Sequence, residues 1–265
     1  MDWLIFLKAT LMGAVEGITE FLPISSTGHL IIAGDLIDFT GPLATTFEIA
    51  IQLGAILSVC WIYREKFLGV LRGLGSDASA QRFVVNLALA FVPAAVLGLL
   101  FHDVITELLF NPVSVAVALV GGGILILIVE RFHFPVDVND VDAMDWRHAL
   151  KVGFMQALAL IPGTSRSGAT IIGGLLFGLS RRAATEFSFF LAVPTMFAAT
   201  GYDLFKNRAA MNAAQIGVFA VGFVVAFITA MIAVKTLLRY VAHHDFSVFA
   251  WYRIVFGGLV LWYFW

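Results

Sequence analysis

The stretch EGITEFLPISSTGHL, residues 16–30, sets two carboxylates, two serines, two threonines and a histidine into an apolar region that runs from about residue 3 to 37. Its centre, LPISSTG at residues 22–28, is typical of a break between two helices, because proline interrupts a helix and serine and threonine favour helix starts. A second apolar region, about 149–180, is interrupted in the same way by IPGTSRSG at residues 161–168. These two breaks decide the expected fold.

Each arm of a broken region is little more than half as long as a membrane-crossing helix, which needs about 20 residues. The arms are therefore either parts of ordinary spans joined by a loop, or re-entrant hairpins that enter and leave on one side. We favour the re-entrant interpretation, because irregular backbone survives at membrane depth only where it is buried in protein or lines a cavity.

The composition is that of an integral membrane protein: 60% of the 265 residues are hydrophobic, 13% are charged, and the mean hydropathy is +0.94. Apolar runs predict about six full crossings, at residues 44–63, 84–101, 113–130, 183–202, 216–236 and 248–265. We expect one all-α polytopic membrane domain over residues 1–265, with about six transmembrane helices and two re-entrant half-helix hairpins, at about 3–37 and 149–180.

The chain resembles one unit used twice, over residues 1–130 and 145–265, since each broken region is followed by about three crossings. Three is an odd number, so the second unit is expected to lie upside down relative to the first, as in the inverted-topology repeats of many transporters. This arrangement brings the two breaks together near the middle of the membrane.

The distribution of Lys and Arg indicates which side is cytoplasmic. The segments near 64–83, 131–151, 181–182 and 235–247, with Arg253 counted on their side, hold twelve of the sixteen Lys and Arg residues; Lys8, Lys206 and Arg208 lie on the other side, and Arg166 lies in the second break. The first side is expected to be cytoplasmic, with both chain ends outside.

The composition also argues against some partners and sites. A net charge of -2, a pI near 6.3 and the absence of a basic run argue against nucleic acid as a partner. Cys60 is the only cysteine in the sequence, so neither a disulfide framework nor a thiolate zinc site can be built within the chain.

Glu16 and Glu20 lie four residues apart, so on a helix they share one face. Ionised carboxylates inside a membrane are costly and tend to be functional. Both can stay charged beside a divalent cation or beside Arg166. The alternative is that the pair only neutralises Arg166 inside the bundle, but a salt bridge alone would not require the hydroxyl groups and the histidine next to it.

Hydroxyl residues stand where a helix should begin in both breaks: Ser25, Ser26 and Thr27 in the first, and Thr164, Ser165 and Ser167 in the second. At least one member of each set is expected to cap its helix. Two helix N-termini that face one cavity also form an anion site, for which phosphate is the obvious ligand. Arg166 strengthens this interpretation, because its planar guanidinium can hold two phosphate oxygens at once.

His29 follows Ser26 by three residues, so on a regular helix the two side chains share a face and a proton could pass between them. A lone histidine is often only a polar filler or a cap. The carboxylates and hydroxyl groups around His29 favour a catalytic role.

The first motif, Glu16-x-x-x-Glu20 leading into PISSTGH at residues 23–29, and the second, PGTSRSGAT at residues 162–170, resemble the signature of the BacA-type undecaprenyl-diphosphate phosphatases of bacterial inner membranes. The similarity extends over essentially the whole chain. It implies hydrolysis of the terminal phosphate of undecaprenyl diphosphate, which recycles the lipid carrier of cell-wall synthesis, and an association with bacitracin resistance. It also implies an active site on the periplasmic face that depends on Mg²⁺ or Ca²⁺.

The resemblance implies roles for individual residues. It places Glu16, Glu20, Ser26, His29 and Arg166 at the catalytic centre, with Glu16 and Glu20 as metal ligands. The remaining motif positions expected to bind substrate are Ser25, Thr27, Gly163, Thr164, Ser165, Ser167 and Thr170. We expect Ser26 to attack the terminal phosphorus while Glu20 or His29 takes its proton; direct attack by an activated water is the alternative.

The rival function is transport, either of an anion or of the lipid phosphate itself by a flippase. Anion binding alone gives little reason for two carboxylates, a serine and a histidine to crowd the phosphate position, so hydrolysis is favoured. The expected partners are an isoprenoid lipid diphosphate and membrane lipids. The Gly121–Gly123 run would allow close helix contact, within the protomer or between the two copies of a homodimer.

Overall fold

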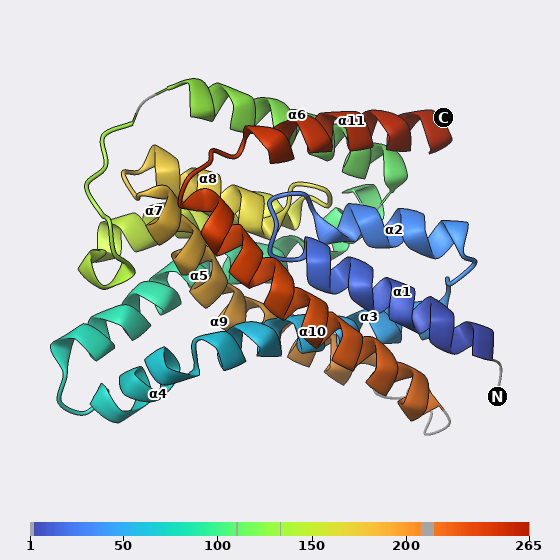
Figure 1. The fold of residues 1–265 in the computed structure, drawn as a ribbon, viewed down its shortest axis with the longest axis horizontal. Helices are drawn as coiled ribbons and strands as arrows, with labels where there is room; N and C mark the ends of the chain where they lie inside the picture. The colour runs from blue at the N-terminus through green and yellow to red at the C-terminus, as the bar shows by residue number, and fades with distance from the viewer. Residues whose placement is uncertain (1–2, 110, 133, 208–214, 265) are drawn as a thin grey trace.

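The computed structural model describes residues 3–109, 111–132, 134–207 and 215–264, and these ranges are largely helical (Figure 1). The helices are α1 (Trp3–Thr19), α2 (Ser26–Leu36), α3 (Pro42–Ile62), α4 (Arg64–Gly73), α5 (Ala78–Leu109), α6 (Pro112–Arg131), α7 (Trp146–Ala157), α8 (Arg166–Leu176), α9 (Arg181–Asn207), α10 (Ile216–Val241) and α11 (Ser247–Phe264), with short 3-10 turns at Val141–Ala143 and Leu158–Leu160. Arg208, assigned above to the outer side, lies outside the described residues.

Six of the described helices are long and apolar enough to cross a membrane, namely α3, α5, α6, α9, α10 and α11. Each coincides with one predicted crossing, so the prediction of an all-α polytopic membrane protein is confirmed. The predicted limits were short for α5, which begins six residues earlier at Ala78, because polar residues extend the helix beyond its apolar part. Helix α4 occupies part of the segment 64–83, where no helix was predicted.

The broken regions fold into four shorter helices, α1, α2, α7 and α8, none of which is among the six candidate spans. Helices α2 and α8 have 11 residues each, and at about 1.5 Å per residue such a helix covers roughly half of a bilayer core. These lengths suit re-entrant hairpins. The re-entrant course itself stays a prediction.

Each broken region packs against a span from the other half of the chain: α1 lies along α10, and α7 lies along α5. The backbones come into direct contact, because a Cβ added at Gly13 of α1 would lie 2.5 Å from the Gly222 carbonyl oxygen, and one added at Gly153 of α7 would lie 2.6 Å from the Ala90 carbonyl oxygen. Two interlocked copies of one unit would exchange partners in this way. The division at 1–130 and 145–265 and the inverted orientation stay predictions.

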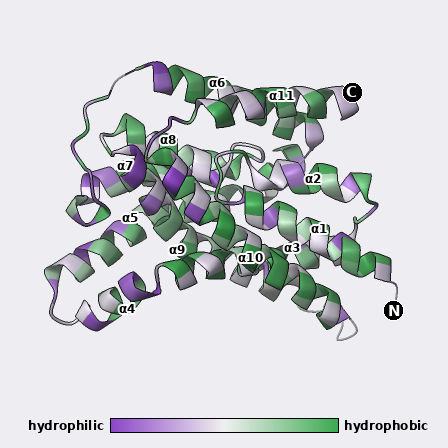
Figure 2. Cartoon of the chain, in the orientation of Figure 1, coloured by the Kyte–Doolittle hydropathy of each residue, from purple (hydrophilic) through white to green (hydrophobic). Residues whose placement is uncertain are grey.

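The two ends of the molecule differ in polarity. Helix α4 and the segment 134–145 lie at one end, whereas the first turn of α1 and the last turn of α11 lie at the other (Figure 1). Hydrophilic residues gather around α4, α7 and the adjoining end of α6 (Figure 2). The segments that hold α4 and residues 134–145 thus lie on the side opposite to the first turn of α1 and the last turn of α11, as the charge distribution led us to expect. The assignment of the polar end to the cytoplasm stays a prediction.

The largest apolar core surrounds α9, the most buried of the six candidate spans. Phe187, Phe189 and Phe190 of α9 are almost fully buried. Phe21, in the first break, packs edge-on against Phe189 with 5.5 Å between ring centroids. The core therefore anchors the first break at the centre of the molecule.

Candidate active site

The two breaks meet at the centre of the structure, where the segment that joins α1 to α2 lies beside the segment that enters α8 (Figure 1). Ser167 Oγ donates a hydrogen bond of 2.7 Å to the carbonyl oxygen of Leu22. Arg253 donates to carbonyl oxygens of both segments, Pro23 at 3.1 Å and Thr164 at 2.9 Å. Polar residues about 140 positions apart in the sequence are therefore brought together, as predicted.

The backbone has an unusual conformation at the same point of both breaks. Ser25, directly before α2, has φ 69°, and Ser165, directly before α8, has φ 72°. The backbone of a residue other than glycine is strained at such angles, at a cost on the order of 1–3 kcal/mol. Strained residues of this kind cluster at functional sites. Surrounding contacts must hold both serines in place.

A chain of hydrogen bonds connects the first break to the second. Ser26 Oγ donates to Glu20 Oε2 over 2.5 Å, and Arg166 Nη2 donates to Glu20 Oε1 over 3.0 Å. The side chains of Glu20 and Arg166 are 9% and 12% exposed, so the charges of this ion pair are little screened by solvent. Three of the five predicted catalytic residues thus form one connected unit.

Arg166 is held in position by the surrounding helices. Its Nη1 donates to the carbonyl oxygen of Ser188 over 2.9 Å, and its guanidinium lies over the ring of Phe21, 5.7 Å from the centroid. Its Nε is buried and has no hydrogen-bond partner. Buried polar atoms are nearly always paired, so an open donor here indicates a place for an acceptor that is brought by a ligand.

Glu16 lies one helical turn before Glu20 and is 1% exposed. Its Oε1 is also buried without a hydrogen-bond partner. The charges that act on it come from Glu20, Glu48 and Arg166, two of its own sign and one opposite. Of the four unpartnered buried side-chain polar atoms found in the described residues, this acceptor and Arg166 Nε are the two that belong to the predicted site.

His29 lies on α2 as predicted, but its ring makes no hydrogen bond to Ser26. One ring nitrogen, Nδ1, lies 2.7 Å from the Ser25 carbonyl oxygen, and the other, Nε2, lies 2.7 Å from the Tyr252 hydroxyl. Because a carbonyl oxygen can only accept, Nδ1 carries the proton and Nε2 is the acceptor in the neutral ring. Both nitrogens are engaged away from Ser26, whose hydrogen bond runs to Glu20 instead.

The hydroxyl residues of the second break are largely used to hold the protein together. Ser165 Oγ caps α8 by accepting from the Gly168 amide at 3.1 Å. Thr170 Oγ1 bonds to Ser188 Oγ at 2.7 Å, while Ser167 bonds across to the first break. Gly163, with φ 91°, and the half-buried Thr164 present their carbonyl oxygens to Arg253.

In the first break the expected cap is missing. Ser25 precedes α2, but its side chain makes no capping hydrogen bond. The half-buried Thr27 stands in the first turn. The prediction that a hydroxyl group caps each helix is therefore confirmed for α8 and wrong for α2, where Ser26 is engaged by Glu20 instead. The first amide groups of α2 are left without a side-chain cap, as an anion site requires.

Two residues of the site were missed by the sequence analysis. Arg253 was assigned to the cytoplasmic side, which is wrong, because it lies inside α11 with 1% of its surface exposed. A charged residue within an apolar span was the signal that could have revealed it. Tyr252 offers no such signal, since aromatic residues are common throughout α11.

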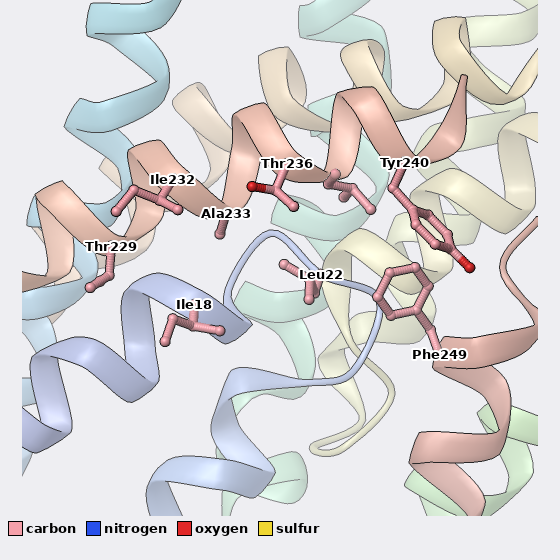
Figure 3. A pocket seen from close by; sticks show the side chains of 9 residues that line it. Ile18, Leu22, Thr229, Ile232, Ala233, Thr236, Tyr240 and Phe249 are labelled. Atoms are coloured by element: carbon pink, nitrogen blue, oxygen red, sulfur yellow. The ribbon is translucent and has the colours of Figure 1, made fainter. Parts of the chain in front are cut away.

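An apolar groove of about 330 Å³ adjoins the first break (Figure 3). Leu22 of the break and Ile18 of α1 line one wall, and Ala233, Tyr240 and Phe249 lie among the residues opposite. No charged side chain lines the groove, so it suits a hydrocarbon chain.

The structure thus defines a polytopic α-helical membrane protein with a buried serine–carboxylate–arginine site between two helix breaks. The chain belongs to the family described as bacitracin resistance protein BacA, whose sequence model matches residues 9–259.

Its relatives include the undecaprenyl-diphosphatase of Nitrosomonas eutropha, which is 62% identical over 261 residues that cover 98% of this chain and 95% of the relative. The undecaprenyl-diphosphatase of Nitrosospira multiformis is also 62% identical, over 98% of this chain and 96% of its own length. Undecaprenyl-diphosphatase 2 of Rhodospirillum rubrum is 60% identical, again over 98% of this chain and 96% of the relative.

Proposed function

We propose that this protein is an undecaprenyl-diphosphate phosphatase, which releases inorganic phosphate from undecaprenyl diphosphate and leaves the monophosphate carrier for cell-wall synthesis. The names of relatives about 60% identical over nearly the whole chain support this activity. The observation that carries it in this chain is the hydrogen-bonded unit of Ser26, Glu20 and Arg166. It joins a nucleophile, a base and a phosphate-binding cation at one buried point.

In the first step, Ser26 Oγ attacks the terminal phosphorus and Glu20 Oε2 takes the hydroxyl proton. The new bond joins Oγ to phosphorus, and the bond that breaks joins phosphorus to the bridging oxygen, which leaves with the lipid monophosphate. Glu20 passes this proton to the departing lipid monophosphate. Water then attacks the phosphoserine, Glu20 accepts a proton from the water and returns it to Ser26 Oγ as the bond between Oγ and phosphorus breaks, and inorganic phosphate departs. The hydrogen bond from Ser26 to Glu20 supports Glu20 rather than His29 as the base.

Arg166 would hold the phosphoryl group through the reaction. Its unpartnered Nε is the donor available to a phosphate oxygen, and its fixed planar geometry suits binding of two oxygens. The uncapped amide groups of α2 would take further oxygens. Positioning and charge stabilisation of this kind supply most of the rate enhancement in phosphoryl transfer.

Glu16 and Glu20 fit a divalent cation, Mg²⁺ or Ca²⁺. The Glu16 Oε1 atom is a buried carboxyl oxygen that has no hydrogen-bond partner. No group of three or more His, Cys, Asp or Glu side chains suited to a metal occurs in the described parts of the chain, but Mg²⁺ commonly takes only one or two carboxylates together with substrate phosphates and waters. A bound cation would neutralise phosphate charge beside these carboxylates.

His29 would position the nucleophile. Its Nδ1–H donates to the carbonyl of Ser25, the strained residue directly before Ser26. The ring is fixed on its other side by the hydroxyl of Tyr252 and by stacking on Phe256, with 4.1 Å between ring centroids. His29 therefore helps to hold the backbone angle that directs Ser26 towards Glu20.

The chain is a multi-pass membrane protein, and we place it in the bacterial inner membrane with the site open to the periplasm. The support is the concentration of Lys and Arg in the segments near 64–83 and 131–151, at the end of the molecule that holds α4. This end is expected to face the cytoplasm, which leaves the end with the first turn of α1 for the periplasm. The predicted homodimer gains no support from the glycine run, because Gly122 and Gly123 contact α11 within the same chain.

A phosphate-release assay on a purified sample tests the function. Undecaprenyl diphosphate is supplied in detergent, without any gradient, to the parent and to Glu20→Ala, each with and without a chelator. The parent should release phosphate, and both the chelator and the substitution should stop it. A parent protein that moves lipid phosphate across vesicle membranes but releases none would be a transporter or flippase, and the proposal would be wrong.

A trapping experiment tests the nucleophile. Rapid acid quenching followed by mass spectrometry should find a phosphoryl group on the peptide that contains Ser26, and Ser25→Ala should still show it. If Ser26→Ala keeps a tenth of the parent rate, water rather than serine attacks the phosphorus.

A further inference from the structure

The most completely buried cation of the described chain, Arg253, lies outside the hydrogen-bonded unit of Ser26, Glu20 and Arg166. It stands in α11 with 1% of its surface exposed. None of the ion pairs found among the described residues includes it. An unpaired charge at such depth is costly and is expected to have a function.

The guanidinium of Arg253 makes five hydrogen bonds, all to backbone carbonyl oxygens. Nη1 donates to Pro23 at 3.1 Å and to Thr164 at 2.9 Å. Nη2 donates to Gly163 at 3.1 Å and to Ala118 at 3.1 Å, and Nε donates to Leu119 at 3.2 Å. The acceptors belong to the first break, the second break and α6.

These contacts fix the two breaks relative to each other. Pro23 lies three residues before Ser26, and Thr164 lies two residues before Arg166. A single nitrogen, Nη1, bridges their two carbonyl groups, so a shift of the guanidinium would move the serine and the arginine apart.

We propose that Arg253 is a positioning residue of the phosphatase reaction, which aligns Ser26 in one half of the chain with Arg166 in the other without touching the substrate. This inference rests on the proposed function. It goes beyond that function in assigning the alignment of the two breaks to one side chain of the last helix.

The expected signature is a loss of kcat with little change in KM. Ground-state binding relies on the lipid tail and on phosphate contacts that either break can make alone. The transition state requires both breaks at once, and a misplacement of about 1 Å can cost roughly 10²-fold in rate. Lysine would keep the charge but cannot reach five carbonyl oxygens from one ammonium group.

Adjacent glycines of α6 offer a matched pair of variants that leave Arg253 itself intact. A Cβ at Gly122 would lie 2.2 Å from Arg253 Nη2 and 2.8 Å from its Cζ, so Gly122→Ala must displace the guanidinium. A Cβ at Gly121 would meet nothing within 4 Å, so Gly121→Ala is the control.

The experiment compares the parent, Arg253→Lys, Gly122→Ala and Gly121→Ala as full chains in detergent. For each, phosphate release is divided by the amount of folded protein from gel filtration, and amide hydrogen exchange is followed in residues 22–28 and 161–168. In Arg253→Lys and Gly122→Ala we expect kcat to fall at least roughly tenfold, KM to stay within about twofold of the parent, and exchange to rise in both breaks together. Gly121→Ala should match the parent.

Three results would overturn the inference: parent-like kcat per folded molecule in both Arg253→Lys and Gly122→Ala, a loss fully explained by less folded protein, or faster exchange in one break only. Failure of the parent itself to release phosphate would instead refute the proposed function, and the exchange data would still decide whether Arg253 holds the two breaks together.

Discussion

The two breaks have closely similar backbones and opposite chemistry. Each places a serine with positive φ directly before an 11-residue helix. In the first break the next residue is Ser26, and in the second it is Arg166. Nine positions before Ser25 stands Glu16, and nine positions before Ser165 stands Gln156. The first break supplies carboxyl groups and a nucleophile, and the second supplies a cation.

The comparison teaches how two helix breaks with similar backbones produce one site rather than two. Gln156 is buried like Glu16, but its side-chain oxygen accepts a hydrogen bond of 3.3 Å from Thr195, whereas Glu16 Oε1 has no partner. Ser165 caps its helix, whereas Ser25 does not. Protein contacts thus engage Gln156 and Ser165 in the second break, where Arg166 Nε is the atom left open for a ligand, whereas in the first break Glu16 Oε1 and the uncapped end of α2 are left open.

The largest expected effect comes from removing the cation of the second break. Arg166→Ala should lower the rate of phosphate release by roughly 10³-fold or more, and Arg166→Lys should restore little of it because the planar fork is lost. The assay uses a polyprenyl diphosphate in detergent. Near-parent activity in the lysine variant would show that two-oxygen binding by this side chain is unnecessary.

The next effect comes from the base of the first break. Glu20→Gln keeps the shape of the side chain but removes its charge, so kcat should fall by roughly 10²–10⁴-fold. Gln156→Glu, which adds a carboxylate in the second break at the position that corresponds to Glu16, is the comparison variant and should not restore activity to Glu20→Gln. Restored turnover in the double variant would mean that either break can supply the carboxylate.

A smaller effect is expected from the support of His29. Tyr252→Phe keeps the ring that stacks near His29 and removes only the hydroxyl bonded to Nε2. One neutral hydrogen bond is worth about 1 kcal/mol, so kcat should fall by less than about tenfold. Phosphate release from the same lipid substrate measures it. A hundredfold loss would give Tyr252 a direct part in the chemistry.

The smallest effect is a difference in stability between variants of the two serines that directly precede α2 and α8. Ser165→Ala removes a helix cap and should destabilise the protein by about 1 kcal/mol, whereas Ser25→Ala removes no capping bond and should leave the melting temperature almost unchanged. Thermal unfolding in detergent, followed by circular dichroism, compares them. Equal losses would indicate that Ser25 caps α2 after all.

Much of the fold was predictable because its signals are local. Apolar runs gave the six spans, and proline with serine and glycine gave both breaks. Helix α4 was missed since its Arg64, Glu65 and Lys66 read as a connecting segment, and a short polar helix is specified by what it packs against. Here Lys66 pairs with Asp142, 76 residues later in the chain.

The site was predictable at the level of which residues gather, and less so at the level of which atoms bond. The spacing of Ser26 and His29 on one helix suggested a proton pathway between them. In the structure Ser26 is hydrogen-bonded to Glu20, and His29 is hydrogen-bonded to Tyr252. The turn before α2 brings the end of α1 close to the serine, and α11 packs beside the histidine. Such partners come from tertiary contacts, which no local spacing encodes.

The bond between Arg253 and Pro23 joins residues 230 positions apart, almost the full length of the chain. A ribosome delivers the first break long before α11, so the nascent protein must hold this break while the guanidinium that fixes it has not yet been synthesised. The two breaks are therefore fixed relative to each other only when α11 is inserted, and chains that end before α11 should release no phosphate.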